Sequence, residues 1–253
     1  MYEIPPHIVH AFLLNRARRS DESSFIPPFF LFQPIETTAY ALAESAVLTR
    51  PLEQLESLQR EAQQLQVRVQ FLFLAACMPD LAQQLLAAGY ERAEPPLFMC
   101  CTPETLSSAP PLDGLRVAVS DSSAPLEEVR DGLEVNERGF DPSSTKQFSD
   151  EEVQEFRATL VNSRAFTAYL HDQPVAAGMY TEPFDLLTEL VGITTLKPFR
   201  GRGIARAITA AMTATAFEHG IALVVLGAVD EQAARVYRQV GFRPFPVDAF
   251  WLP

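Results

Sequence analysis

The stretch that decides the fold is Leu190–Ala205, which reads LVGITTLKPFRGRGIA. Its first six residues have the apolar and β-branched character of a strand, and a helix-forming run follows a short turn. Gly201 and Gly203 carry no Cβ atoms, so a ligand can approach the turn closely. The first turn of the helix offers unpaired N–H groups and the positive end of its dipole, and Arg200 and Arg202 add charge. The segment predicts a site for a phosphate or pyrophosphate. The alternative is a plain strand–helix turn with arginines in solvent.

Strands and helices alternate on both sides of this turn. In the C-terminal part we expect strands over Leu115–Ser120, Ala165–His171, Val175–Glu182, Leu186–Leu196, Ala222–Ala228 and part of Phe242–Leu252, and helices over Ala124–Gly139, Asp150–Asn162, Gly203–His219 and Glu231–Val240. This order predicts an α/β (α+β) fold with a mixed, mostly antiparallel central sheet flanked by helices.

A second lobe is expected before a segment rich in Pro, Ser and Thr at 102–111, so we predict domains over 1–108 and 109–253. In the first lobe we expect a loop over Phe25–Pro34, strands over Ala39–Leu48, Val67–Ala75 and Glu94–Thr102, and helices over Leu52–Gln66 and Pro79–Ala88. A glycine and an aromatic residue follow a helix in each lobe, at Gly89-Tyr90 and at Gly241-Phe242. This similarity is either a faint internal repeat or a common way to end a helix.

Two motifs resemble those of the GNAT superfamily of N-acyltransferases. Pro198–Ala205 resembles its acyl-CoA-binding loop, Arg/Gln-x-x-Gly-x-Gly/Ala, because Arg200, Gly203 and Ala205 fill the pattern. A second motif, Asn-x-x-Ala-x-x-x-Tyr-x-x-x-Gly-Phe, is matched by Asp230, Ala233, Tyr237, Gly241 and Phe242. Asp230 departs from the usual Asn, which puts in doubt any contact that Asn donates to the cofactor. The first lobe has no comparable loop, so a copy there would be degenerate.

The resemblance implies an N-acetyltransferase that moves an acetyl group from acetyl-CoA to a primary amine of a small molecule or peptide by direct transfer. The strand Leu190–Thr195 would splay from Leu223–Ala228 to form the cofactor cleft. The implied cofactor-binding residues are Ile193, Thr195, Arg200, Gly201, Arg202, Gly203, Ile204, Ala205, Asp230 and Ala233.

The resemblance also suggests catalytic groups. Tyr237 matches the family's tyrosine and would protonate the leaving thiolate, while a strand N–H would stabilise the oxyanion. Glu189 is the first candidate for the base and Glu182 the second. The alternatives are a core aromatic for Tyr237 and solvated carboxylates for the two glutamates. No His lies at metal-ligand spacing from a Cys, so no metal is expected.

The amino-acid composition limits the chemical classes of partner that we expect. The formal net charge of −12 argues against nucleic acid and slightly favours a cationic acceptor such as a polyamine, an aminoglycoside-like molecule or a peptide amine. Apolar runs are about eight residues long, so no membrane span is expected. Three cysteines without a disulfide pattern, and an N-terminus unlike a leader, predict a cytoplasmic protein. We expect the first lobe or a second subunit, as in a homodimer, to supply a strand that the C-terminal sheet lacks.

Two other functions stay open. One is a non-catalytic acyl-CoA-binding sensor or interaction module. The other is a transferase that uses a longer acyl or an aminoacyl donor.

Overall fold

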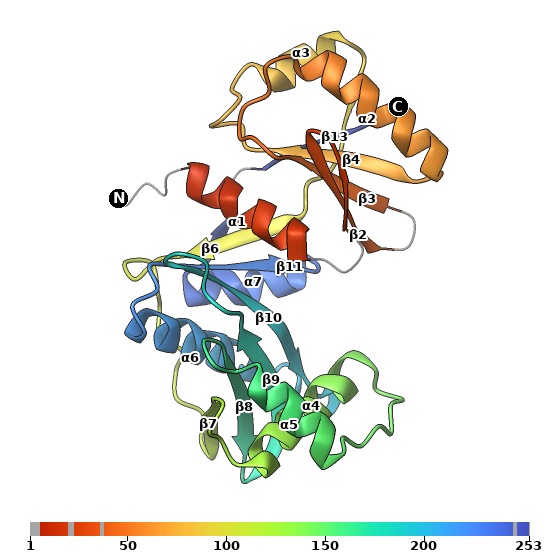
Figure 1. Cartoon of the computed structure of the whole chain (residues 1–253). Coiled ribbons are helices and arrows are strands. Elements are labelled where there is room, and N and C mark those ends of the chain that lie inside the picture. The colour runs from red at the N-terminus through yellow and green to blue at the C-terminus, as the bar shows by residue number, and fades with distance from the viewer. Residues whose placement is uncertain (1–5, 20–22, 36–37, 245–246, 253) are drawn as a thin grey trace. The chain divides into compact units, whose positions relative to one another are not determined.

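Two separate sheets organise the chain, one in each of two units (Figure 1). The computed structural model describes residues 6–19, 23–35, 38–244 and 247–252. The first unit comprises Met1–Pro96 and Pro246–Pro253, and the second comprises Leu97–Phe245. Each unit has its own buried hydrophobic core, which is what defines a separate domain.

The first unit is a six-stranded sheet with order β1-β2-β3-β4-β13-β5. Its elements are α1 (Pro6–Arg19), β1 (Ser23–Ile26), β2 (Phe29–Ile35), β3 (Thr38–Ala43), α2 (Pro51–Leu65), β4 (Arg68–Phe73), α3 (Leu81–Ala87), β5 (Glu91–Arg92) and β13 (Asp248–Trp251). β3 and β4 run parallel, and the other described pairs are antiparallel. Phe71 stacks on Phe73, and Phe73 on Phe250, in the core.

The second unit is a seven-stranded sheet with order β12-β6-β11-β10-β9-β8-β7. Its elements are β6 (Leu97–Cys101), β7 (Leu115–Ser120), α4 (Leu126–Phe140), α5 (Asp150–Ala158), β8 (Arg164–Leu170), β9 (Gln173–Tyr180), β10 (Leu187–Thr195), the 3-10 helix η1 (Lys197–Phe199), α6 (Ile204–Glu218), β11 (Leu223–Ala228), α7 (Glu231–Val240) and β12 (Arg243–Pro244). Only β10 and β11 are parallel among its described pairs.

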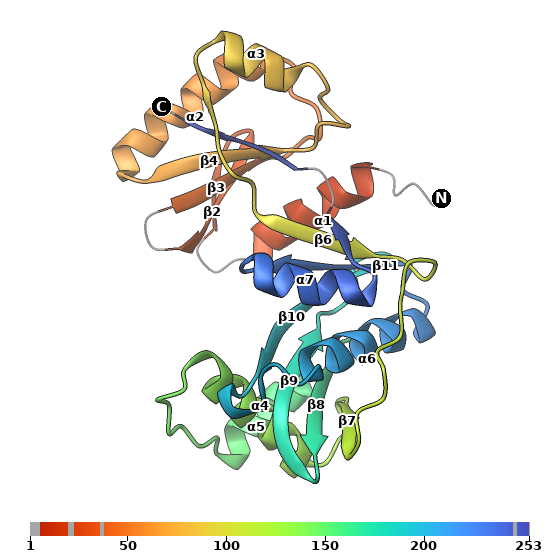
Figure 2. The same cartoon turned by 180° about the vertical axis from the view of Figure 1, so that it is seen from behind.

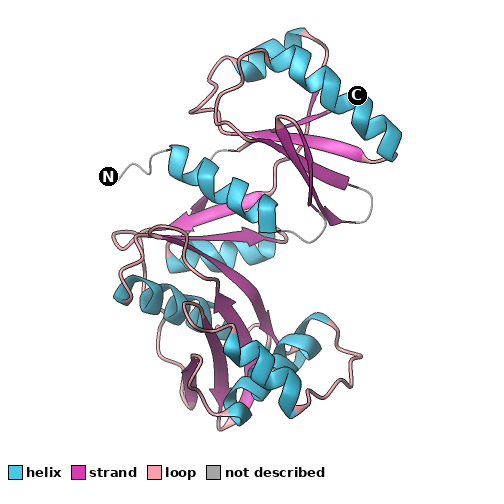
Figure 3. Ribbon diagram, viewed as in Figure 1, coloured by secondary structure: helices cyan, strands magenta, loops and turns pink. Residues whose placement is uncertain are grey.

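Helices cover both faces of this second sheet (Figures 2 and 3). Phe166 of β8 shares a core with Ile208 of α6, whereas the next residue, Thr167, lies against Gly132 of α4. Successive strand residues point to opposite faces, so α6 and α4 lie on opposite sides of the sheet. The expected α/β fold, with mixed and mostly antiparallel sheets flanked by helices, is confirmed.

The loop expected over Phe25–Pro34 was wrong, because this segment forms the hairpin of β1 and β2. Ser23 pairs with Phe32 at one end, and the two prolines at 27 and 28 lie in the turn. The side chains of Phe29 and Leu31, two residues apart on the strand, both point into the core, at 0% and 2% exposure. Burial of these side chains favours a strand despite the nearby prolines.

The units divide the chain at a different place from the expected boundary after residue 108. β6 lies before that boundary in sequence but pairs with β11 over Leu97–Cys101 and also with β12. β13, near the C-terminus, pairs with β4 and β5 in the first unit. The strand that the C-terminal sheet was expected to lack thus comes from the residues before the linker, and no second subunit is needed to supply it.

The same order of elements occurs in both units. In the first, β3, α2, β4 and α3 follow one another, and in the second β10, α6, β11 and α7 do. Both strand pairs are parallel, and α2 and α6 are each 15 residues long. The similarity between the two units therefore covers four consecutive elements, and not only the glycine and aromatic residue that follow α3 and α7.

Candidate active site

The strands β10 and β11 part after a short stretch of pairing. The two strands pair only from Leu187 with Leu223 to Glu189 with Val225. Beyond this point β10 continues along β9, while β11 continues along β6. Main-chain groups on one edge of each strand are thereby left for another partner, as the resemblance implied for Leu190–Thr195 (Figure 1).

A β-bulge lies in the part of β10 that pairs with β9 but no longer with β11. Val191 pairs with Met179 and Thr194 with Ala177, so Gly192 and Ile193 together face a single residue of β9. Gly192 has a φ of 65°, which a residue with a Cβ rarely adopts. Its carbonyl accepts a 2.6 Å hydrogen bond from Nδ2 of Asn136 on α4. The bulge removes the amides of these two residues from the regular ladder.

Thr195 presents its main chain on the edge of β10 that faces away from β9. The amide of Leu196 donates to the carbonyl of Val175 on the β9 side at 2.9 Å. Main-chain groups of neighbouring strand residues point to opposite edges, so those of Thr195 face away from β9. Its hydroxyl is buried without a hydrogen-bond partner in the described residues. Ile193 lies two residues earlier, so its main-chain groups point to the same edge of β10 as those of Thr195.

The turn after β10 has the shape of an anion cradle. Gly201 and Gly203 have φ of 77° and 83°, and Gly203 is the N-cap of α6. A Cβ at Gly201 would meet nothing within 4 Å, and one at Gly203 would meet only methyl groups of Leu112 at 3.7 Å. The amides of 201–206 donate to no acceptor in the described part of the chain. The space over these donors is open to a ligand.

The two arginines of the turn do different things. Arg200 donates from Nε to the carbonyl of Thr195 at 2.9 Å and from Nη2 to the carbonyl of Gly139 at 3.1 Å. It therefore ties the turn to β10 and to the end of α4. Arg202 is exposed, and its guanidinium lies 5.5 Å from the ring centre of Phe199. Both arginines are exposed, but the guanidinium of Arg202 makes no hydrogen bond within the described residues, so its charge stays available over the turn.

Asp230 begins α7. Its carboxylate accepts the amide of Ala233 at 2.8 Å, which is the ordinary bond of an N-cap. Asp and Asn perform this capping equally well, since only an acceptor is needed. The departure from Asn therefore preserves the local structure.

Tyr237 lies on the buried face of α7, at 8% exposure, and packs against Phe242. Burial raises the pKa of its hydroxyl to about 12, and the charge of Asp230 adds to the rise. The hydroxyl makes no hydrogen bond within the described residues and is not completely enclosed. Tyr237 thus carries a proton at neutral pH and has no protein acceptor for it.

The two glutamates lie in different surroundings. Glu189 is 8% exposed on β10, and its amide donates to Oγ1 of Thr181. It points to the same face as Val191, two residues further along the strand. Glu182 is exposed, accepts a 2.9 Å hydrogen bond from Asn162, and lines a separate cavity of about 410 Å³. Burial and strand position favour Glu189 over Glu182 as the group near the bulge.

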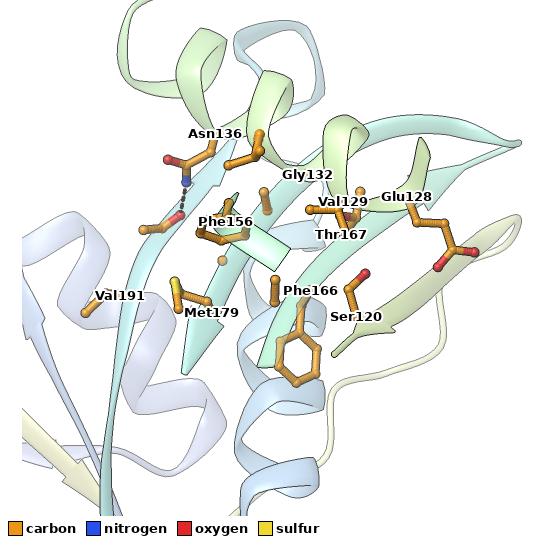
Figure 4. Close-up of a pocket in the computed structure, with 15 residues that line it drawn as sticks. Ser120, Glu128, Val129, Gly132, Asn136, Phe156, Phe166, Thr167, Met179 and Val191 are labelled. Carbon is orange, nitrogen blue, oxygen red and sulfur yellow. Dashed lines mark hydrogen bonds between the residues drawn. The ribbon is translucent and has the colours of Figure 1, made fainter. Parts of the chain in front are cut away.

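A cavity of about 240 Å³ lies beside the bulge, between α4 and the sheet (Figure 4). Val191 and Gly192 line one end of it. Sequence reasoning missed both this cavity and Asn136. The available signal was the spacing of Gly132 and Gly139 on one face of an amphipathic helix, because a Cβ at either position would collide with a threonine of the sheet.

The part of the chain that the structure describes holds no group of three or more His, Cys, Asp or Glu that could bind a metal ion. Among the described helices, none is long and apolar enough to cross a bilayer.

Comparisons with known proteins give a family match for part of the chain and a fold shared with several solved structures. Residues 133–242 match the model of the acetyltransferase (GNAT) family. A GCN5-related N-acetyltransferase from Kribbella flavida is similar in structure, with a TM-score of 0.67, 22% identity, and coverage of 97% of this chain and 94% of that one. A tandem GNAT protein from the clavulanic acid biosynthesis pathway has a TM-score of 0.58, 14% identity, and coverage of 88% and 77%. A GCN5-related N-acetyltransferase from Sphaerobacter thermophilus has a TM-score of 0.59, 16% identity, and coverage of 88% and 76%. A search of curated sequences found no match. Residues 133–242 therefore form an acyltransferase domain of the GNAT family.

Proposed function

We propose that this protein transfers an acetyl group from acetyl-CoA to a primary amine of a small molecule or peptide. The observation that carries the proposal is that three features follow one another along the chain. They are the bulge of β10, the open glycine turn and the free amides that begin α6. A thioester linked to a pyrophosphate needs main-chain partners along its arm and several N–H donors at the pyrophosphate. The bulge of β10 supplies the main-chain partners, and the turn and the start of α6 then supply the N–H donors.

The cofactor residues have separate roles in the proposal. Main-chain groups of Ile193 and the amide of Thr195 hold the pantetheine arm as an added strand, while the Thr195 carbonyl stays bonded to Arg200. The amides of the turn, from Gly201 to Ala205, hold the pyrophosphate, with the charge of Arg202 nearby. Arg200, Asp230 and Ala233 act indirectly, because their side-chain and main-chain bonds fix the ends of α6 and α7.

Acetyl-CoA supplies the activated acyl group. An amide freed by the bulge, at Gly192 or Ile193, donates to the oxygen that becomes negative during transfer. Glu189 receives the proton of the attacking amine, directly or through water. Tyr237, whose raised pKa keeps its hydroxyl protonated at neutral pH, donates its phenolic proton to the departing sulfur.

The first unit is proposed to be a degenerate copy of the same fold. Its β3–α2–β4 order supports this, together with the parallel pairing of β3 and β4. The three cysteines form no disulfide, which is consistent with a reducing compartment such as the cytoplasm.

The test is a calorimetric titration of acetyl-CoA into the wild type, Gly203→Asp and Gly220→Asp. Gly220 is a matched control: it has the same φ of 83°, has nothing within 4 Å of a built Cβ, and lies beyond the other end of α6. The two sites are separated by about 25 Å along the helix.

A carboxylate at position 203 would face the pyrophosphate, at a cost of up to about 4 kcal/mol per close charge pair. We therefore expect at least about 100-fold weaker binding for Gly203→Asp and little change for Gly220→Asp. Absence of binding to a folded wild-type protein, or equal loss in both variants, would sink the assignment of the turn.

A further inference from the structure

Thr195 carries a buried hydroxyl at the end of β10. The residue is 8% exposed, and its Oγ1 has no hydrogen-bond partner among the described residues. The hydroxyls of Thr188 and Thr209, which are also buried, donate to main-chain carbonyls at 2.6 and 2.7 Å. Buried polar groups are nearly always satisfied, so the unpaired hydroxyl of Thr195 indicates a partner that comes from outside the chain.

The side chain of Thr195 points to the face of the sheet that α6 covers. The preceding residue, Thr194, lies against Gly139 of α4, on the opposite face. Thr195 pairs with Ala176 of β9, and Ala176 shares a buried core with Ile204 at the start of α6. The hydroxyl therefore lies on the side of the sheet where α6 begins, in the part of β10 that no longer pairs with β11.

The fold alone gives no reason for a hydroxyl at this position. Valine has nearly the shape of threonine and is as well suited to a buried strand. A buried hydroxyl without a partner costs free energy that the second methyl group of valine does not. The polar atom of Thr195 is therefore better explained by a ligand than by the stability of the free protein.

The main chain of Thr195 shows what this ligand needs. The carbonyl of Thr195 already accepts Nε of Arg200 at 2.9 Å, while its amide faces the edge away from β9. A pantetheine arm that lies along β10 as an added strand presents both the C=O and the N–H of an amide. The Thr195 amide can donate to that C=O, but a carbonyl next to a guanidinium is a poor acceptor for that N–H. The hydroxyl supplies an acceptor on the same residue.

The order of the site along the chain identifies which amide this is. The pantetheine arm of CoA contains two amides, one next to the sulfur-bearing end and one nearer the pyrophosphate. The proposed function places the acyl group at the bulge of Gly192 and Ile193, and the pyrophosphate at the turn of 201–205. Thr195 comes after the bulge and before the turn, so it lies level with the amide nearer the pyrophosphate.

We propose that the Thr195 hydroxyl accepts a hydrogen bond from the N–H of the pantetheine amide nearer the pyrophosphate. The hydroxyl thereby selects acetyl thioesters that carry the whole pantetheine arm over shorter ones. This inference rests on the proposed function, which places the cofactor along β10. Thr195 is a cofactor-binding side chain in this proposal and takes no part in proton transfer.

The experiment measures the affinity of four ligands. They are acetyl-CoA, the phosphorylated ADP half of CoA, S-acetylpantetheine, which has both amides and no nucleotide, and S-acetyl-N-acetylcysteamine, which has only the amide next to the sulfur. Calorimetry serves for the first two, and displacement of acetyl-CoA for the two short thioesters. The variants are Thr195→Val, Thr195→Ser and Thr194→Val. Thr194 is the matched control, because it is adjacent, 7% exposed, and on the face toward α4.

We expect Thr195→Val to bind acetyl-CoA and S-acetylpantetheine about 10-fold more weakly than the wild type, because a buried N–H then loses its acceptor. Its affinity for the ADP half and for S-acetyl-N-acetylcysteamine should be unchanged. Thr195→Ser keeps the hydroxyl and should retain the affinity for all four ligands, as should Thr194→Val. The thermal midpoint of free Thr195→Val should be equal to or higher than that of the wild type, because the variant loses only an unpaired hydroxyl.

Unchanged acetyl-CoA affinity in Thr195→Val overturns the inference, and so does an equal loss for the ADP half or in Thr194→Val. A lower thermal midpoint of free Thr195→Val also overturns it, because the hydroxyl then has a partner in the free protein. Absence of acetyl-CoA binding to the folded wild type overturns the proposed function together with this inference. Binding by the wild type that Thr195→Val leaves intact overturns this inference alone.

Discussion

The hydrogen bond from Asn136 to the Gly192 carbonyl makes a sharp prediction about catalysis. It is 2.6 Å long, half-buried, and joins α4 to the bulge of β10. Asn136→Asp keeps the shape of the side chain but replaces the donor with a carboxylate that faces a carbonyl oxygen. Asn136→Ala removes the donor alone. In both variants the Gly192 carbonyl loses its partner, and the backbone at φ 65° loses its support.

The magnitude follows from the energetics of such bonds. Leaving a buried acceptor unsatisfied costs about 1–3 kcal/mol, so we expect Asn136→Ala to lower the free energy of unfolding by that amount. Asn136→Asp should cost at least as much. If the freed amides of the bulge stabilise the transition state, misplacing them should lower kcat about 10- to 100-fold, because such donors contribute about 2.7–4 kcal/mol in other enzymes. The KM for acetyl-CoA should change little, since the turn before α6 is untouched.

The assay combines urea unfolding with steady-state kinetics on the best amine. Asn162→Ala is the control, because Asn162 is exposed and its 2.9 Å bond to Glu182 lies outside the bulge. Its unfolding free energy should change by less than about 0.5 kcal/mol, with kcat unaltered. If Asn136→Ala loses stability as expected but retains full kcat, the contact is purely structural and the reasoning about the bulge is refuted.

Four further predictions concern catalysis, stability at high pH, the turn before α6 and the number of cofactor sites. Tyr237→Phe should retain acetyl-CoA affinity but lose turnover; an acyl-CoA sensor would show no turnover to lose. The Tyr237 hydroxyl has a pKa of about 12 in the folded state against 10.0 unfolded, so its contribution to stability is complete below pH 10 and is lost as pH rises through 12. Alkaline unfolding of the wild type should therefore show an extra decline of about 2–3 kcal/mol that Tyr237→Phe lacks. Arg200→Lys replaces a planar fork, which donates from two separate nitrogens to two carbonyls, with a single ammonium nitrogen, so we expect about 1–2 kcal/mol lower stability and about 10-fold weaker acetyl-CoA binding by calorimetry. Calorimetry should also give one acetyl-CoA per chain, and two equal sites would contradict the degenerate first unit.

Local patterns explain most of what the sequence could predict. The strand, glycine turn and helix of Leu190–Ala205 depend on residues that are neighbours in the chain, and the structure places them as expected. Pro51, at the first position of α2, and the capping box of Ser149 and Glu152 were equally local. Such features are decided by backbone sterics and nearby hydrogen bonds, which a sequence displays directly.

Long-range pairing explains what the sequence could not predict. The contact of Asn136 with Gly192 joins residues 56 positions apart, and no periodicity marks it. The pairing of β6 with β11 joins Leu97 to Ala228. The aromatic residues of Phe25–Pro34 fit a loop or a strand, and only the buried surface against β3 decides between them.

A comparison of the repeated elements supports the proposal that only the second unit holds a cofactor site. In the first unit, β3 and β4 stay paired over five consecutive residues, from Thr38 with Arg68 to Leu42 with Leu72, so no edge is free between them. Pro51 at the start of α2 removes one of the N–H donors that an anion would need. In the second unit the parallel pairing stops after three residues, and glycines precede α6. We therefore expect the β–α–β arrangement of the second unit, and not that of the first, to bind the cofactor, because only there do the two strands part early and glycines begin the helix.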